Sequence, residues 1–82
     1  MDQDTSVWTL IRELRVRLGL TGEQFGEKVG LSKGKVSELE RGIFVPGVRV
    51  AVAIEQLSGG EIDAADLSED VRLARSAPQA AE

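Results

Sequence analysis

The apolar residues of this chain recur at the spacing of α-helices in several short segments, which glycines separate. In the first segment the intervals are four, three and four residues, as expected for one side of a helix. This stripe comprises Val7, Ile11, Leu14 and Leu18. Ser6 or Thr5 is placed to cap the start of the helix, and Gly19 is placed to end it in a left-handed conformation.

A second helix is predicted to begin after Thr21. Thr21 and Gln24 have the spacing of a capping box, in which each side chain accepts a hydrogen bond from the other residue's backbone N–H. Phe25 and Val29, four residues apart, supply the apolar face of this helix. Gly30 is expected to stop it.

A third helix is predicted over residues 33–41, with Ser32 as its N-cap. Val36 and Leu39 form its inner face, and Gly42 ends it. Two short helices joined by a tight turn that contains glycine are typical of a helix-turn-helix, in which the second helix enters the major groove of DNA. This segment therefore favours sequence-specific DNA binding over catalysis.

A fourth helix is predicted to run from Pro46, in its first turn, to about Leu57. Its expected core stripe consists of Val50, Ala53, Ile54 and Leu57. Val48 and Val52 extend the apolar surface around most of the helix. A helix of this kind is either deeply buried or shared with a partner.

The remaining segment is acidic and less regular. Ile62 and Leu67 flank an acidic turn and are expected to close the bottom of the core, and a short helix is predicted after Ser68. Residues 76–82 have nothing to bury and are expected to be disordered. The predicted organisation is an acidic N-terminal tail (1–5), a helix-turn-helix domain (6–67), and a short C-terminal helix or dimerisation segment that ends in a disordered tail (68–82).

Composition excludes several classes of function. Eighty-two residues make one small domain without cysteine or histidine. A disulfide framework, the commonest general base and the commonest metal ligand are therefore absent, and we expect no enzymatic activity, no metal and no cofactor. The longest uninterrupted apolar run, residues 50–54, is too short to span a bilayer, and the acidic N-terminus does not resemble a signal peptide. We expect a cytoplasmic protein, associated with the nucleoid when it is bound to DNA.

The net charge of −4 at first argues against a partner as acidic as DNA. Its distribution is more favourable, because residues 7–42 carry seven Lys or Arg against five Asp or Glu, a balance of +2. The excess of acid lies in the two flanking segments. This distribution supports DNA binding only weakly, and it predicts modest non-specific affinity with a shallow salt dependence.

The pattern resembles the DNA-binding domains of the lambda-repressor and Cro type, the Xre family. The resemblance covers roughly residues 10–57 and is carried by the segments LIRELRVRLGLT, FGEKVGLS and VSELERG. It implies an all-α fold, a compact bundle of four to five helices. The second and third helices would form the helix-turn-helix, with the third helix in the major groove.

The resemblance and the predicted exposed face of the third helix indicate which residues meet DNA. They are Thr21, Ser32, Lys33, Gly34, Lys35, Ser37, Glu38 and Arg41. Lys33 is suited to donate to guanine O6 and N7, and Glu38 to accept from cytosine N4. Lys35, Ser37 and Arg41 are better suited to phosphate, which positions a protein without reading sequence. Solvated charge is the alternative for the three cations, and a surface salt bridge is the alternative for Glu38.

The resemblance also implies a structural ion pair between Arg15 and Glu40, which would fix helix packing rather than touch DNA. Two positions depart from the family's pattern. Gly22 stands where many members have a glutamine that contacts phosphate, and Gly26 stands where alanine is usual. The missing glutamine predicts a lower affinity for DNA, although backbone N–H groups at the helix start remain available to a phosphate.

These features predict a transcriptional regulator, a repressor that binds a palindromic operator as a homodimer. The candidate dimer surface consists of Trp8, Phe44, Val48, Val52, Leu67 and Val71, for which burial in the chain's own core is the alternative. A second hypothesis is an antitoxin or accessory regulator that binds a protein partner, a toxin or another regulator. Its contacts would come from the fourth helix and the acidic C-terminal segment. The family favours a bacterial or phage source.

Overall fold

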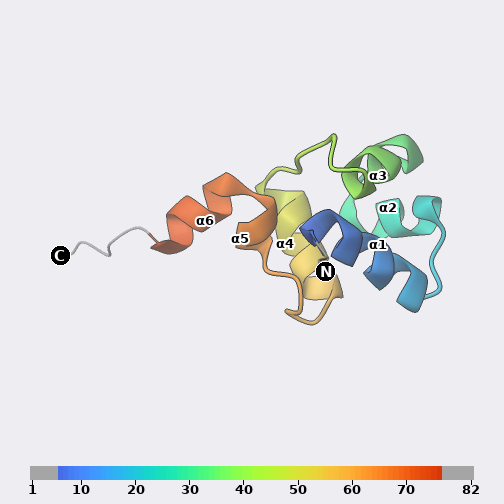
Figure 1. Ribbon diagram of the computed structural model, residues 1–82, viewed down its shortest axis with the longest axis horizontal. Coiled ribbons are helices and arrows are strands. Elements are labelled where there is room, and N and C mark those ends of the chain that lie inside the picture. Colours follow the sequence, from blue (N-terminus) through green and yellow to red (C-terminus); the bar gives the residue numbers. More distant parts are fainter. Residues whose placement is uncertain (1–5, 77–82) are drawn as a thin grey trace, which may run out of the picture.

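The computed structural model describes residues 6–76, and within that range the chain is all-α, without strands. Its helices are α1 (Val7–Arg17), α2 (Gly22–Val29), α3 (Lys33–Glu40), α4 (Val48–Leu57), α5 (Ala64–Leu67) and α6 (Glu69–Ser76) (Figure 1). Helices α1 to α5 lie in the segment predicted as the domain, and α6 is the predicted C-terminal helix. The predicted fold class is confirmed. The acidic tail (1–5) and residues 77–82 of the tail predicted to be disordered lie outside the described residues. Ser76 was predicted to begin that tail, but it is the last residue of α6.

Local capping signals define the ends of α2 and the start of α3. Thr21 Oγ1 accepts from the N–H of Gln24 at 3.1 Å, and Gln24 Oε1 accepts from the N–H of Thr21 at 2.9 Å, so the predicted capping box is present. Gly30 ends α2 at φ +88°, a left-handed conformation that favours glycine. Ser32 caps α3 by accepting from the N–H of Lys35 at 3.2 Å.

Helix α1 is shorter than its apolar stripe suggested. Ser6 is its N-cap, and Ile11 and Leu14 are buried in the core. Leu18 was expected to continue the stripe, but it is the C-cap residue and 44% exposed. The helix ends before the fourth apolar position because Gly19, at φ +73°, turns the chain towards α2.

Helix α4 differs from the prediction at its start and in its rotation. Pro46 is buried ahead of the helix, and Gly47 is the N-cap, so Pro46 is not a first-turn residue. The fully buried residues are Ala51 and Ile54. Three residues that were expected in the core stripe are only half-buried, namely Val50, Ala53 and Leu57. A helix that is apolar around most of its surface does not specify its own rotation, so its neighbours decide which side faces inward.

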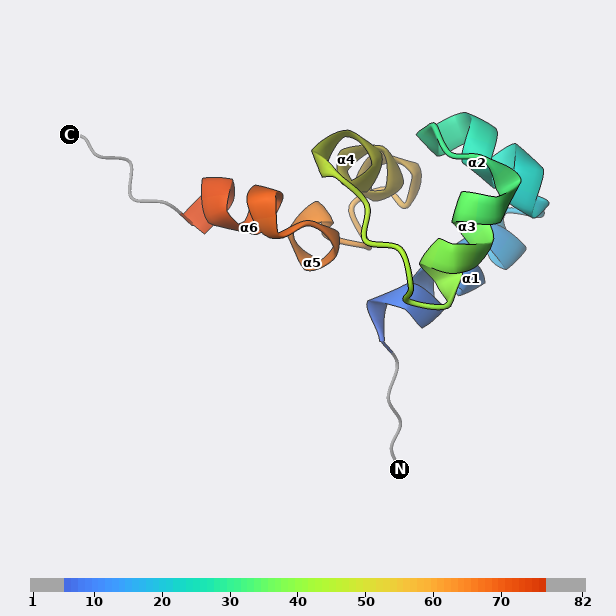
Figure 2. The ribbon, with the colours of Figure 1, turned by 90° about the horizontal axis from the view of Figure 1, so that it is seen from above.

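One hydrophobic core joins all six helices. Its buried apolar residues are Ile11, Leu14, Phe25, Val29, Val36, Leu39, Ala51, Ile54, Ile62, Ala64, Leu67 and Val71. Helix α3 packs on α1 and α2, while α4 packs on α2 and α5. Figure 2 shows α6 extending from the bundle on the side away from α2 and α3. No helix among residues 6–76 has the length and apolar character needed to cross a bilayer.

Burial removes two residues from the predicted dimer surface. Leu67 and Val71 are 2% and 5% exposed and complete the chain's own core, so assigning them to a surface was wrong. Trp8, Phe44 and Val52 are half-buried against the same core. Of the six predicted residues, Val48 is the most exposed, at 45%.

Candidate nucleic-acid interface

A close approach at Gly26 sets the geometry of the turn between α2 and α3. The backbone N–H groups of Gly30 and Leu31 both donate to the carbonyl oxygen of Gly26, at 2.7 and 2.8 Å. A Cβ atom on Gly26 would collide with the carbonyl oxygen of Leu31 and would lie 3.2 Å from Cγ2 of Val36. Because a backbone atom stands in the way, even alanine requires the turn to move. The absence of a side chain therefore allows α3 to pack closely on α2.

Two buried residues determine which side of α3 faces outward. Val36 and Leu39 are 1% and 0% exposed, so the opposite side of the helix is presented to solvent. At 3.6 residues per turn, Gly34, Glu38 and Arg41 run along the middle of that side. Lys33 and Ser37 lie on the edge of this side that is nearer α2. Lys35 lies on the opposite edge, nearer the connector between α3 and α4. The predicted DNA-contacting residues of α3 thus share one exposed face.

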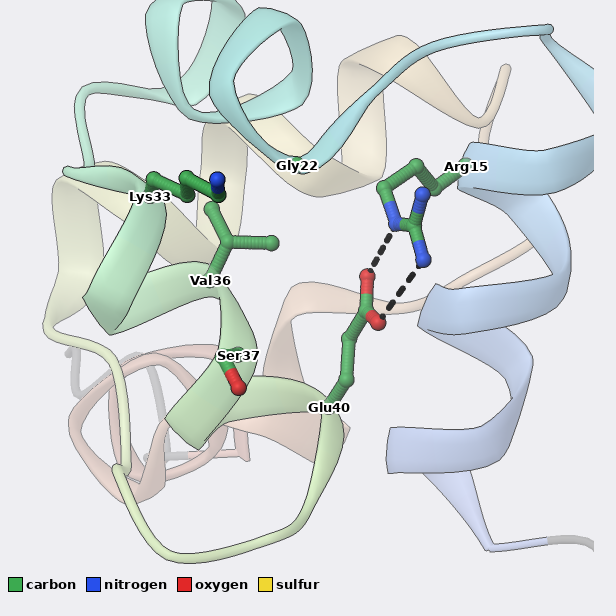
Figure 3. A pocket seen from close by; sticks show the side chains of 6 residues that line it. All are labelled: Arg15, Gly22, Lys33, Val36, Ser37 and Glu40. Carbon is green, nitrogen blue, oxygen red and sulfur yellow. Dashed lines mark hydrogen bonds and ion pairs between the residues drawn. The ribbon is translucent and has the colours of Figure 1, made fainter.

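The edge beside α2 contains a hollow of about 180 Å³ (Figure 3). It is lined by Arg15, Gly22, Lys33, Val36, Ser37 and Glu40. The side chain of Lys33 points from α3 towards Gly22. A Cβ atom on Gly22 would lie 3.9 Å from Cγ of Lys33 and 4.0 Å from Cγ1 of Val36, which are ordinary contact distances. The hollow therefore has room for a side chain at position 22.

Arg15 and Glu40 form an ion pair at the inner end of this hollow (Figure 3). Nε of Arg15 donates to Oε2 of Glu40 at 2.6 Å, and Nη2 donates to Oε1 at 3.2 Å. A further bond runs from Nη1 of Arg15 to the carbonyl oxygen of Leu20, at 3.1 Å. The hydrogen bond to Glu40 raises the pKa of Arg15 above its ordinary value. This arrangement matches the pair that the resemblance implied, and it connects α1, α3 and the loop before α2.

The other edge of α3 carries a cluster made by Lys35, Glu38 and Phe44. Nζ of Lys35 lies 3.3 Å from Oε1 of Glu38 and 4.7 Å from the centre of the Phe44 ring. Glu38 thus forms the surface salt bridge that was the alternative to base recognition. Sequence reasoning placed Phe44 in a dimer surface and did not connect it with Lys35. Helical periodicity carries no such signal, because Phe44 lies beyond the end of α3.

Three of the predicted contacts stand at the ends of the two helices. Thr21 and Ser32 are exposed N-caps, which places the starts of α2 and α3 at the surface. Arg41 is the exposed C-cap residue of α3. Helix starts attract anions because their first N–H groups have no partner within the helix.

Comparison with known proteins agrees with this geometry. The sequence profile of a family described as "Helix-turn-helix" matches residues 11–63. An "Uncharacterized HTH-type transcriptional regulator" of Methanothermobacter thermautotrophicus is 42% identical over 53 residues, which cover 65% of this chain and 77% of the relative. A protein of the same description from Archaeoglobus fulgidus is 32% identical over 65 residues, covering 79% and 93%.

A bacterial relative extends the comparison. The "Uncharacterized HTH-type transcriptional regulator YgzD" of Bacillus subtilis is 39% identical over 44 residues, which cover 54% of this chain and 67% of the relative. No solved structure matches the chain. The matched residues contain the capped helix pair α2 and α3 together with the ion pair that braces it. The chain therefore belongs to the helix-turn-helix family of the lambda-repressor and Xre type.

Proposed function

We propose that this protein is a transcriptional regulator that recognises a specific sequence of double-stranded DNA through α3, and that it is not an enzyme. The observation that carries the proposal is the exposed face of α3. This face is polar, follows a capped helix start, and is held at a set angle by the close approach at Gly26. The names of the three relatives, all HTH-type transcriptional regulators, support the same function. The proposal places the protein in the cytoplasm, with the DNA.

The two edges of α3 favour different contacts. Lys33 and Ser37 line the same hollow as Gly22, the first residue of α2. The first N–H groups of a helix have no partner within it, so this edge suits a phosphate as well as a guanine. Gly34 has open space around it, so DNA can approach the backbone there. Lys35 and Arg41 supply charge to the remaining phosphates, and Thr21 and Ser32 supply the two helix starts.

A homodimer on a palindromic operator completes the proposal, because a single small domain contacts only a few base pairs. Val48 lies just after the connector that leaves α3, and it is accompanied by Ile43 and Val45, which are 64% and 63% exposed. These three residues, together with the half-buried Trp8 and Val52, are the proposed contact between copies. A repressor would then act by occupying the promoter. The bacterial or phage source stays a prediction, since two of the relatives above are archaeal.

Selection of genomic fragments by the purified protein tests the proposal. The best fragment is then used in a mobility-shift assay at increasing salt concentration. We expect a palindromic fragment whose binding weakens with salt and is lost when Lys33→Ala and Lys35→Ala are combined. The control combines Lys28→Ala with Arg72→Ala, which removes the same charge from α2 and α6 and is expected to retain binding.

Failure of the wild-type protein to bind any fragment at low salt would contradict the proposal. The second hypothesis would then be favoured, namely an antitoxin or accessory regulator that holds a toxin or another regulator through α4 and the acidic C-terminal segment. Equal losses in the two double variants would also contradict recognition through α3, because only overall charge would matter.

A further inference from the structure

We propose that Phe44 is a positioning residue for DNA binding, which holds the ammonium group of Lys35 in a set place at the edge of α3. The inference rests on the proposed function. Nζ of Lys35 is 4.7 Å from the centre of the Phe44 ring and 3.3 Å from Oε1 of Glu38. A cation over an aromatic face is attracted by the negative face of the ring, and within about 6 Å the attraction is significant. Lys35 therefore has two partners on separate parts of the chain.

The ring is itself held in place by α3. After Glu38 the chain reverses through Gly42, at φ +76°, and the N–H groups of Ile43 and Phe44 both donate to the carbonyl oxygen of Glu38, at 2.9 and 3.3 Å. Phe44 is half-buried and packs against the core. The residue whose carboxylate contacts Lys35 thus also anchors the backbone of the ring. Lys35, Glu38 and Phe44 consequently form one unit.

Within this unit, Lys35 remains able to bind a phosphate. Its side chain is 51% exposed, and an ammonium group has three donors, of which Glu38 takes one. A free lysine loses rotamer entropy when it is immobilised on a phosphate, whereas a side chain that is already positioned loses less. The ammonium group of Lys35 also neutralises the negative charge of Glu38, which would otherwise repel the phosphates. Phe44 thus contributes to DNA affinity through Lys35, without touching DNA.

The assignment changes the interpretation of Phe44. As a dimer contact, its loss would weaken self-association, and the effect on DNA binding would depend on protein concentration. If Phe44 is a positioning residue, its loss would weaken DNA binding only while position 35 carries a cation. A double-mutant cycle separates these two cases.

The first measurement uses the free protein. Protons on the ε-carbon of Lys35, placed over the ring, should resonate upfield of those of Lys33 in the NMR spectrum. We expect this upfield shift to disappear in Phe44→Leu and to persist in Phe44→Tyr. Identical positions for the two lysines in the wild-type protein would overturn the inference, whatever the protein does with DNA.

The second measurement uses the operator fragment. Phe44→Leu is expected to weaken DNA binding by about two- to fivefold, the range for an exposed cation–π contact. Phe44→Tyr should keep the wild-type affinity for DNA. In a Lys35→Ala background, Phe44→Leu should have no further effect on that affinity. A loss that persists without Lys35, or that tracks dimer dissociation, would overturn the inference.

An isosteric variant guards against unfolding of Phe44→Leu. Site-specific pentafluorophenylalanine at position 44 keeps the shape of the ring, with a modest increase in volume, but reverses its quadrupole. It should weaken DNA binding at least as much as Phe44→Leu while lowering the melting temperature less. Unchanged affinity in this variant would overturn the inference. If the wild-type protein binds no DNA, the proposed function is overturned, and with it the DNA role of Lys35, Glu38 and Phe44. The NMR comparison distinguishes this outcome from failure of the inference itself. The upfield shift of Lys35 remains when only the proposed function is wrong.

Discussion

Arg15 in α1 and Glu40 at the end of α3 are 25 positions apart, yet their side chains form a two-point ion pair. The two side chains are only 21% and 10% exposed, so both groups are largely withdrawn from water. Arg15 also binds the carbonyl oxygen of Leu20, just before α2. The pair thus holds the exposed face of α3 at a set position relative to α1 and the start of α2, without belonging to that face.

Loss of either partner should destabilise the fold, because the other charge would be left buried and unpaired. We expect Arg15→Ala or Glu40→Ala to lower the free energy of unfolding by about 1–3 kcal/mol, measured by urea and thermal unfolding. Arg17→Ala, which breaks the exposed pair of Arg17 with Glu61, is the control. It should lower the free energy of unfolding by about 0–1 kcal/mol. An unchanged melting curve for both Arg15→Ala and Glu40→Ala would remove the structural role of the pair.

The pH dependence of Arg15's contribution follows from the direction of its pKa shift. A group whose pKa is raised on folding stabilises the protein below its unfolded pKa and loses that contribution as the pH rises through its folded pKa. For arginine that window lies far above neutral pH. The difference in melting temperature between the wild-type protein and Arg15→Met should therefore stay constant from about pH 6 to about pH 9. A difference that shrinks across this range would show that another group controls it.

Two helical glycines make a matched pair for testing the close packing of α2 on α3. Gly34→Ala has open space and should raise the free energy of unfolding, by up to about 1 kcal/mol, through helix propensity. Gly26→Ala gains the same propensity but meets the Leu31 carbonyl, so we expect a net loss of about 1–3 kcal/mol. Chemical denaturation measures both. Equal stabilisation by the two changes would show that the turn moves freely.

The hollow at Gly22 predicts a gain of function. A Cβ atom at position 22 meets Lys33 and Val36 only at ordinary contact distances. The longer side chain of Gly22→Gln supplies an amide that can donate to a phosphate. We expect DNA affinity to rise by about two- to tenfold, the range for one net hydrogen bond. Because the amide is uncharged, the slope of affinity against salt concentration should not change. Gly22→Ala, which adds a methyl group without a donor, is the control, and an equal gain there would argue against a phosphate contact.

Helix α6 is attached to the bundle by Val71 and by Arg75. Nη2 of Arg75 lies 3.0 Å from Oε1 of Glu55 in α4, and Nη1 lies 2.8 Å from Oδ1 of Asp63 at the start of α5. Arg75→Ala should speed amide hydrogen exchange in α6 while that of α2 and α3 remains unchanged. Among residues 6–76, Arg72 pairs only with Glu69 in the same helix, so Arg72→Ala is the control and should leave exchange at the α5–α6 junction unaltered.

Much of the fold follows from local signals in the sequence. Thr21 with Gln24, Ser32, and Gly30 define the helix ends of the helix-turn-helix, because caps and left-handed glycines act within a few residues of each other. The exposed face of α3 follows in turn, since Val36 and Leu39 identify its opposite side by helical periodicity. The pair of Arg15 with Glu40 was available only through the family resemblance, because its members lie far apart in sequence.

The sequence by itself therefore determined where the helices of the helix-turn-helix begin and end, and which side of α3 is polar. Only the tertiary structure decided the rotation of α4 that buries Ala51, the burial of Leu67 and Val71, and the place of Lys35 over the ring of Phe44. The physical reason is range. Capping hydrogen bonds and helical periodicity relate residues within one or two turns of each other. An apolar side chain, in contrast, buries equally well in its own core or in a partner until the surrounding helices are in place.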